Sequence, residues 1–128
     1  MATYAPTSII LYVADVDAST AFYRRALGKD PVATFQDFAV FALTSDVTVG
    51  LQTRDAIDPT PTGTPGCVEL SMSYATRDDV DALYREWTTL GFPIALEPTT
   101  RDFGYTFVAH DPDGHRLRVC ATETSGLG

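Results

Sequence analysis

Two arginines near the carboxyl end of the chain, Arg116 and Arg118, have the type and spacing to act together. They alternate with Leu117 and Val119, and such alternation is typical of a strand whose two faces differ. The two guanidinium groups therefore share one strand face. Because a guanidinium group can stabilise an oxyanion, this face is the first candidate for function.

A β-hairpin is predicted to hold this strand. Residues 111–114, Asp-Pro-Asp-Gly, form a turn signal, because proline presets φ and glycine accepts the left-handed conformation. Tyr105 and Phe107 share one face of the preceding arm. His110 and His115 flank the turn, and we expect both to be exposed at the end of the sheet. As metal ligands or bases they would lie away from the strand faces.

The elements that position the hairpin follow from hydrophobic periodicity. Strands are predicted over 8–14, 32–35, 38–43, 47–52, 67–74 and 94–97. A first helix over 18–27 would be capped by Asp17 or Ser19 and ended by Gly28. A second helix would begin after Thr76 and end at Gly91, with Trp87 in the core.

The two halves of the chain repeat one plan. Val16-Asp17-Ala18 recurs as Val80-Asp81-Ala82, 64 positions later, and each half reads strand, helix, three strands. The predicted fold is α+β: two βαβββ modules in tandem, forming curved mixed sheets around a cleft, with helices on the outside. Within a single domain, 1–128, we expect a first module over 7–53, a linker over 54–66, a second module over 67–122 and a flexible tail over 123–128.

The composition suits one globular domain. In 128 residues, 17 acidic and 9 basic residues give a net charge of −8. Because the basic residues are scattered, a nucleic-acid backbone would be repelled. The acidity would attract cationic ligands, but solubility alone is the favoured explanation for it. No apolar run approaches the roughly 18 residues of a membrane span, and residues 1–7 lack signal-peptide features. We therefore expect a cytoplasmic protein that binds neither nucleic acid nor membranes.

The chain resembles the vicinal oxygen chelate superfamily, which includes glyoxalase I, extradiol dioxygenases, fosfomycin-resistance enzymes and bleomycin-resistance proteins. The resemblance is carried by residues 10–17 (Ile-Leu-Tyr-Val-Ala-Asp-Val-Asp), Phe22-Tyr23, Leu27-Gly28, and Phe103-Gly104 leading into 111–119 (Asp-Pro-Asp-Gly-His-Arg-Leu-Arg-Val). It implies two modules around a U-shaped cleft, and commonly a homodimer whose clefts use modules from both chains. We accordingly expect a homodimer.

In metalloenzymes of this superfamily, four side chains on the module strands hold a divalent ion. The matching residues here are Ser8, Gly50, Glu69 and Arg118, of which Glu69 alone could bind a metal. A guanidinium about 5 Å from a divalent ion costs roughly 6 to 7 kcal/mol at an effective dielectric of about 20. The resemblance thus implies no metal and no cofactor. Arginine in the last position is similar to bleomycin-resistance proteins, which bind a drug without chemical change.

The resemblance also implies that Glu69 and Arg118 are neighbours that form a charge-assisted pair. The pair would either bind a ligand or stabilise the contact between two strands. We expect them to lie directly opposite each other in paired strands. In that register Cys67 lies opposite Arg116, and more than about 10 Å separates it from Cys120, beyond the roughly 7 Å reach of a disulfide. Both thiols should be free.

Residues expected to contact a ligand come from strands of both modules. They are Ser8, Tyr12, Phe38, Gln52, Glu69, Ser71, Tyr105, Phe107, Arg116 and Arg118. Strand alternation does not allow Phe38, Phe41, Tyr105 and Phe107 all to face the helices, so some should line the cleft and suit a planar or amphipathic ligand. Ordinary core packing is the favoured interpretation for Phe41, and a solvated rim position for Arg116.

Three functions are compatible with these residues. The leading hypothesis is a metal-free binding protein for a small molecule, aromatic or cationic, that sequesters a toxic or antibiotic compound. The second is a metal-free enzyme with Glu69 as general base or Arg118 as oxyanion stabiliser. The third is a metalloenzyme of the glyoxalase or dioxygenase kind with unrecognised ligands.

Overall fold

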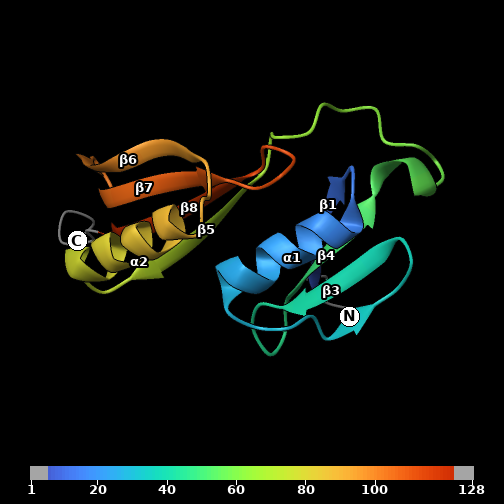
Figure 1. Cartoon of the computed structure of the whole chain (residues 1–128), viewed down its shortest axis with the longest axis horizontal. Coiled ribbons are helices and arrows are strands. Elements are labelled where there is room, and N and C mark those ends of the chain that lie inside the picture. The colour runs from blue at the N-terminus through green and yellow to red at the C-terminus, as the bar shows by residue number, and fades with distance from the viewer. Residues whose placement is uncertain (1–5, 123–128) are drawn as a thin grey trace, which may run out of the picture. The chain divides into compact units, whose positions relative to one another are not determined.

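The computed structural model describes residues 6–122. The chain divides into two compact units, with the boundary between Pro65 and Gly66. Each unit contains one helix and one four-stranded sheet, in the order strand, helix, three strands (Figure 1). This is the expected α+β fold with two tandem βαβββ modules. In this part of the chain no helix is both long and apolar enough to cross a membrane. The predicted tail, 123–128, lies outside the described residues.

The first unit is built on a mixed sheet. Its elements are β1 (Ser8–Val13), α1 (Val16–Leu27), β2 (Ala33–Thr34), β3 (Phe38–Ala42) and β4 (Thr48–Thr53). The strand order is β1-β4-β3-β2; β1 and β4 are parallel and the other pairs are antiparallel. A 3-10 helix, η1 (Arg54–Ala56), opens the segment that the sequence predicted to be an irregular linker.

Helix α1 begins two residues before its predicted start. Asp15 caps it, because its Oδ1 accepts hydrogen bonds from the backbone N–H groups of Asp17 and Ala18 at 3.0 and 3.2 Å. The prediction of Asp17 or Ser19 as the cap is therefore wrong. The C-terminal prediction is confirmed, since Gly28 ends the helix with φ of 67°, where a side chain would be strained.

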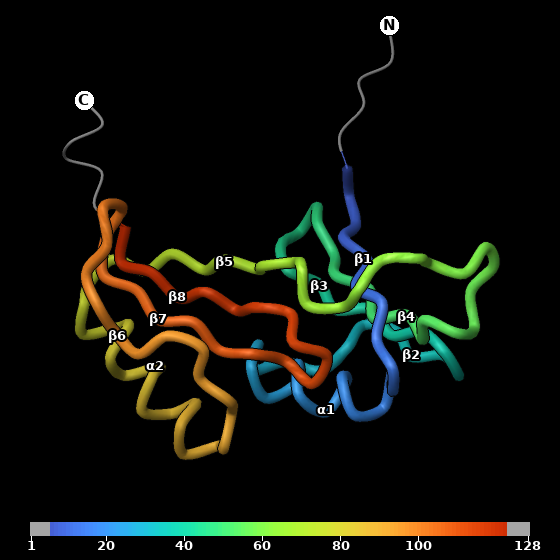
Figure 2. Tube along the Cα trace, turned by 90° about the horizontal axis from the view of Figure 1, so that it is seen from above, coloured from blue at the N-terminus to red at the C-terminus, as the bar shows by residue number. Residues whose placement is uncertain are grey.

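Apolar side chains from alternate strand positions pack under α1. They include Leu11, Val13, Phe41, Val49 and Leu51 from the sheet and Phe22 and Tyr23 from the helix, none more than 4% exposed. The rings of Tyr23 and Phe41 lie 6.4 Å apart between their centroids. Each helix lies along one face of its own sheet (Figure 2), so the other face of each sheet is left without a helix.

The second unit repeats this plan. Its elements are β5 (Glu69–Tyr74), α2 (Arg77–Thr89), β6 (Ile94–Arg101), β7 (Gly104–His110) and β8 (Arg116–Thr122), with the sheet order β5-β8-β7-β6. Thr76 caps α2 as predicted, in a reciprocal pair of hydrogen bonds with Asp79. Trp87 is 1% exposed, and its ring centroid lies 5.5 Å from those of Phe92 and Phe107. Its predicted place in the core is confirmed.

Strand β6 is longer than the predicted strand 94–97. Proline at position 98 lacks the N–H that a regular ladder needs, which favours an early end of the strand. The pairing with β7 instead shifts register between Ile94 and Leu96 and again between Leu96 and Thr99. Because residues at such irregularities are left unpaired, the proline needs no ladder hydrogen bond there, and β6 continues past it to Arg101.

The predicted register between the first and last strands of this unit is wrong by two residues. Glu69 pairs with Arg116, and Arg118 pairs with Ser71. A shift of two keeps every side chain on its predicted face, because side chains alternate with a period of two. Cys120 is therefore opposite Ser73 instead of Ser71. Both cysteines are free, as predicted.

The two turn histidines are not exposed, contrary to the prediction. His115 is 4% exposed and His110 is half-buried. The carboxylate of Asp111 explains the first case: its Oδ1 accepts hydrogen bonds from the backbone N–H groups of Asp113 and His115 at 2.9 and 2.8 Å. These bonds fold the turn back on itself and bring His115 in from solvent.

The two thiols should differ sharply in reactivity. Cys67 is exposed whereas Cys120 is 3% exposed, so a chromogenic disulfide reagent should modify one thiol rapidly in the native protein and the second after unfolding. Cys67→Ser should abolish the rapid phase, and Cys120→Ser should leave it intact. Two rapid equivalents, or no thiol detected after unfolding without reductant, would contradict the structure.

Candidate functional site

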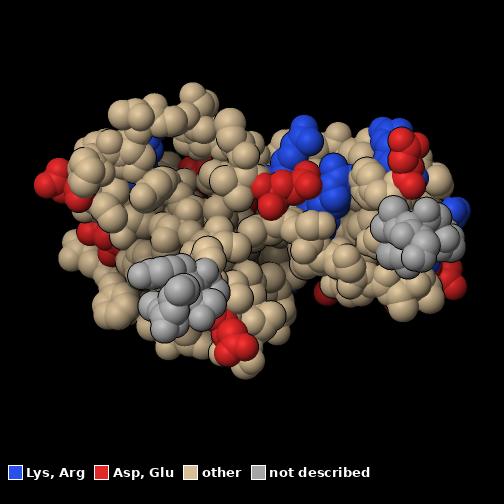
Figure 3. Space-filling view, turned by 180° about the vertical axis from the view of Figure 1, so that it is seen from behind, with Lys and Arg blue, Asp and Glu red and all other residues tan. Residues whose placement is uncertain are grey.

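Functional side chains are expected on the sheet faces that no helix covers. Figure 3 shows the molecule from behind, relative to the view of Figure 1. Over the second unit, Lys and Arg side chains lie next to Asp and Glu side chains, whereas the surface over the first unit is mainly uncharged. The two units therefore present different chemistry on equivalent faces.

The first uncovered face consists of nine residues in three rows across β1, β4 and β3. The rows are Tyr12, Gln52 and Phe38; Ile10, Gly50 and Val40; and Ser8, Thr48 and Ala42. This face brings together the four ligand-contact residues that the sequence predicted in this unit. Tyr12 and Ile10 are each 37% exposed, so the face offers aromatic and aliphatic surface to a ligand.

The centre of the first uncovered face is closed by side chains that pack over Gly50. A Cβ atom at this position would lie 2.6 Å from Cδ1 of Ile10 and 2.7 Å from Cζ of Phe38. Real Cβ atoms do not approach other atoms so closely, so these two side chains occupy the space that a residue at position 50 would need. Glycine thus makes a continuous apolar floor possible here.

The polar groups of this face are already engaged within the protein. Ser8 Oγ lies 2.8 Å from Thr48 Oγ1, and Gln52, 9% exposed, donates from Nε2 to the carbonyl oxygen of Thr53 at 3.1 Å. Ring surface at Tyr12 and Phe38 is consequently the main feature that this face can offer to a ligand.

The second uncovered face is polar and charged. It includes Glu69, Ser71 and Ser73 from β5, Arg116, Arg118 and Cys120 from β8, Thr106, Val108 and His110 from β7, and Thr99 and Arg101 from β6. It gathers the predicted ligand residues Glu69, Ser71, Arg116 and Arg118. The two arginines share this face, as the alternation of β8 predicted.

Arg118 is held in place from three sides. Its Nε donates to Oε2 of Glu69 at 3.0 Å, and Nη1 donates to Oγ1 of Thr106 at 3.2 Å. Its guanidinium carbon lies 5.3 Å from the ring centroid of Phe103. The predicted charge-assisted pair is thus confirmed, although the side chains of Arg118 and Glu69 are 18% and 35% exposed. The pair is partly hydrated and not deeply buried.

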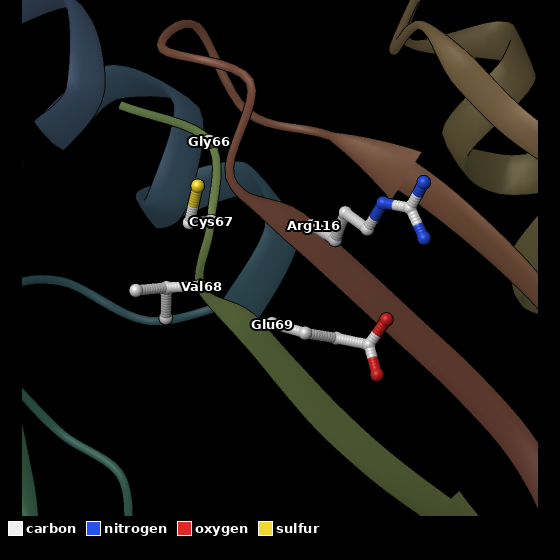
Figure 4. Close-up of a pocket in the computed structure, with 5 residues that line it drawn as sticks. All are labelled: Gly66, Cys67, Val68, Glu69 and Arg116. Atoms are coloured by element: carbon white, nitrogen blue, oxygen red, sulfur yellow. The ribbon is translucent and has the colours of Figure 1, made fainter. Parts of the chain in front are cut away.

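Arg116 lies beside a hollow at the start of β5. The hollow, of about 520 Å³, is lined by Gly66, Cys67, Val68, Glu69 and Arg116. Figure 4 shows the Glu69 and Arg116 side chains extending from neighbouring strands to the same side, and Val68 pointing away from them. The hollow is largely open to solvent.

Tyr105 and Phe107 lie on the other face of β7, toward α2. The Tyr105 hydroxyl donates to Oδ1 of Asp81 at 2.7 Å, and Arg77 lies 5.1 Å from its ring centroid. The bond to Asp81, together with burial, raises the pKa of the Tyr105 hydroxyl. Phe107 is fully buried against Trp87. The prediction that both contact a ligand on the uncovered face is wrong, because alternation places both on the α2 side of the sheet, where Phe107 is in the core and Tyr105 is half-buried.

Sequence reasoning missed two residues that hold Arg118. Thr106 could have been found, because alternation places it on the same face as the arginines, one position from Phe107. Phe103 belongs to the turn between β6 and β7, which has no periodicity, so its contact with Arg118 had no signal in the sequence. Its 45% exposure leaves ring surface open beside the guanidinium.

The residues that the resemblance places at metal positions are hydrogen-bonded to other groups or have no ligating side chain. Ser8 is hydrogen-bonded to Thr48, and Gly50 has no side chain and no room for one. Glu69 already accepts a hydrogen bond from Arg118, whose fixed positive charge would repel a cation. Elsewhere within residues 6–122, no three His, Cys, Asp or Glu side chains gather to hold a metal.

A double-mutant cycle should detect the Glu69–Arg118 pair. Because both side chains are partly exposed, we expect Glu69→Gln and Arg118→Met to be coupled by about 0.5 to 1 kcal/mol in urea unfolding. The matched control is Glu69→Gln with Arg116→Met, since Arg116 is directly opposite Glu69 yet forms no ion pair with it. That cycle should be additive; equal coupling in both cycles would refute a specific pair.

Substitution of Gly50 should be costly even by alanine. The added Cβ must displace Ile10 and Phe38, so Gly50→Ala should lower the free energy of unfolding by about 1 to 3 kcal/mol. Ile10→Val, which removes the clashing Cδ1, should restore part of the loss in the double variant. Gly63→Ala is the control, because nothing lies within 4 Å of its added Cβ. A neutral Gly50→Ala would show that the floor is not closed.

Comparison with known proteins agrees with this geometry. The model of the Glyoxalase/Bleomycin resistance protein/Dioxygenase superfamily matches residues 5–119. The phenazine antibiotic resistance protein EhpR of Enterobacter agglomerans is 33% identical over 121 residues, which cover 92% of each chain.

Solved structures with the same fold are also found. Protein ATC0852 from Agrobacterium tumefaciens is 37% identical with a TM-score of 0.81, over 94% of this chain and 99% of that one. A glyoxalase/bleomycin resistance protein/dioxygenase from Nocardioides superposes with a TM-score of 0.83 at 19% identity, over 98% of this chain and 88% of that one. The chain therefore belongs to the glyoxalase/bleomycin resistance protein/dioxygenase superfamily.

Proposed function

We propose that this protein binds a small planar aromatic compound without transforming it, and thereby sequesters a toxic or antibiotic molecule. The observation that carries the proposal is the Glu69–Arg118 pair. It joins two of the residues that stand at the superfamily's metal positions and uses the one carboxylate among them. On this proposal the protein works without the metal ion on which its enzymatic relatives depend.

The apolar first uncovered face supports an aromatic ligand. Tyr12 and Phe38 flank Gln52 in one row, and Ile10 and Phe38 close the floor over Gly50. Flat aromatic ligands gain from stacking on such rings, and the contact requires no hydrogen bond from polar groups that are already engaged.

The similarity to EhpR supports the same class of ligand. That relative is a phenazine antibiotic resistance protein, and phenazines are flat tricyclic aromatic molecules. Identity of 33% over 92% of both chains makes a related ligand a reasonable first choice for testing.

A metal-free enzyme is the other function open to this site, with Glu69 as the base. Its carboxylate, however, accepts a hydrogen bond from Arg118 at 3.0 Å, so one of its two oxygens is already engaged. Arg118 is in turn held by Thr106 and Phe103, so the arrangement is fixed. Binding alone is therefore favoured over catalysis.

Binding of phenazine to purified protein tests the proposal. Isothermal titration calorimetry should detect saturable binding, and mass spectrometry after prolonged incubation should recover phenazine unchanged. Phe38→Leu should weaken binding about 3- to 10-fold, because it removes a stacking ring. Phe92→Leu is the control, since Phe92 belongs to the second unit and packs against Trp87 in its core.

Two outcomes would overturn the proposal. Conversion of phenazine to a product, with or without added divalent metal, would show an enzyme. Absence of binding to phenazine would remove the proposed ligand class.

A further inference from the structure

Gln52 uses one end of its side-chain amide and leaves the other end available. Its Nε2 donates to the carbonyl oxygen of Thr53 at 3.1 Å. Among residues 6–122, no group donates a hydrogen bond to its Oε1. The side chain is 9% exposed, yet Oε1 is not sealed from solvent, because it is not one of the polar atoms that are both buried and without a partner. A hydrogen-bond acceptor is therefore left open on the first uncovered face.

The orientation of this amide is set by Thr53. A backbone carbonyl oxygen accepts hydrogen bonds and cannot donate, so the end of the amide that faces it must be the NH₂ group. The backbone N–H of Thr53 in turn donates to the carbonyl oxygen of Asp37 at 2.9 Å, which holds Thr53 in place at the end of β4. Turning the amide over would break the bond to Thr53 and bring two oxygen atoms together. The available end of the amide is consequently the oxygen.

Gln52 lies between the two aromatic side chains of the first uncovered face. In the register of the sheet it is directly opposite Tyr12 of β1 on one side and Phe38 of β3 on the other. Neighbouring strands are about 4.8 Å apart, so the backbones of Tyr12 and Phe38 are separated by about 10 Å across β4. A flat ligand that contacts both rings must therefore pass over Gln52.

Covering Oε1 restricts the chemistry of the ligand. In the free protein, water can donate a hydrogen bond to this oxygen. A ligand that excludes water without a donor of its own leaves the acceptor buried and unpaired, which weakens binding. A ligand with an N–H or O–H group at the same place restores the hydrogen bond. Phenazine has no such group, because its two ring nitrogens only accept.

We infer that the ligand is an aromatic ring system with an N–H or O–H group, such as an amino or hydroxyl substituent, that donates to Oε1 of Gln52. The inference rests on the proposed function and names a chemical feature of its ligand. Tyr12 and Phe38 offer ring surface to any flat aromatic compound. Gln52 determines specificity, because its oxygen distinguishes a compound that donates from one that does not.

Aminophenazines and methylphenazines form matched pairs of probes. The two substituents are similar in size, but only the amino group donates. By symmetry phenazine has two kinds of ring carbon that carry hydrogen, so the 1- and 2-substituted pairs place the donor at every distinct edge position. Titration calorimetry at pH 7.5 should show at least one amine binding about 5- to 10-fold more tightly than its methyl counterpart. This ratio of affinities reports on the hydrogen bond.

Gln52→Leu should bring the ratio close to one, because it removes the acceptor and keeps an apolar side chain. Phe38→Leu is the matched comparison. It removes ring surface but no hydrogen-bonding group, so it should weaken both members of a pair and leave their ratio unchanged. A circular dichroism spectrum like that of the parent protein would establish that each variant is folded. Gln52→Met, whose side chain is closer in length to glutamine, takes the place of Gln52→Leu if the latter does not fold.

The outcomes separate the inference from the proposed function. If neither amine binds more tightly than its methyl counterpart, the inference fails while aromatic binding stands. If the preference for the amine persists in Gln52→Leu, or falls equally in Phe38→Leu, the donor is not recognised by Gln52 and the inference also fails. If the parent protein binds neither phenazine nor any of its derivatives, the proposed function itself fails.

Discussion

The central strands of each sheet have one face packed under a helix and one face left uncovered. This alternation determines where functional side chains can lie. In β4, Val49 and Leu51 pack under α1, which leaves Gly50 on the uncovered face. In β8, Leu117 and Val119 are fully buried, which leaves the two arginines on the opposite side. A slip of one residue would bury both guanidinium groups, so the core itself fixes the site.

The same constraint explains what the sequence could predict. Alternation, helix caps and the internal repeat define the elements and the face of each residue, so the paired modules and the shared face of the arginines could be predicted. Alternation cannot detect a shift of two residues, because such a shift preserves every face. The register of β5 and β8 was therefore wrong, while the Glu69–Arg118 contact was right, since a long arginine side chain spans two positions.

Other errors have separate physical causes. Tyr105 and Phe107 were expected to contact a ligand because aromatic rings suit a binding wall, but their own alternation points them at α2. The burial of His115 depends on Asp111, whose carboxylate organises the turn through two backbone hydrogen bonds. Turn geometry of this kind leaves no periodic signal in a sequence. The contact between Phe103 and Arg118 was missed for the same reason.

The packing over Gly50 restricts the order in which this surface could change during evolution. An acidic residue at position 50 would first need smaller side chains at positions 10 and 38, because Ile10 and Phe38 fill the space around the backbone. With glycine still at position 50, those smaller side chains would leave an unfilled space above it. Each of these substitutions alone would therefore destabilise the protein. The residues at positions 10, 38 and 50 must change together, which preserves the apolar surface.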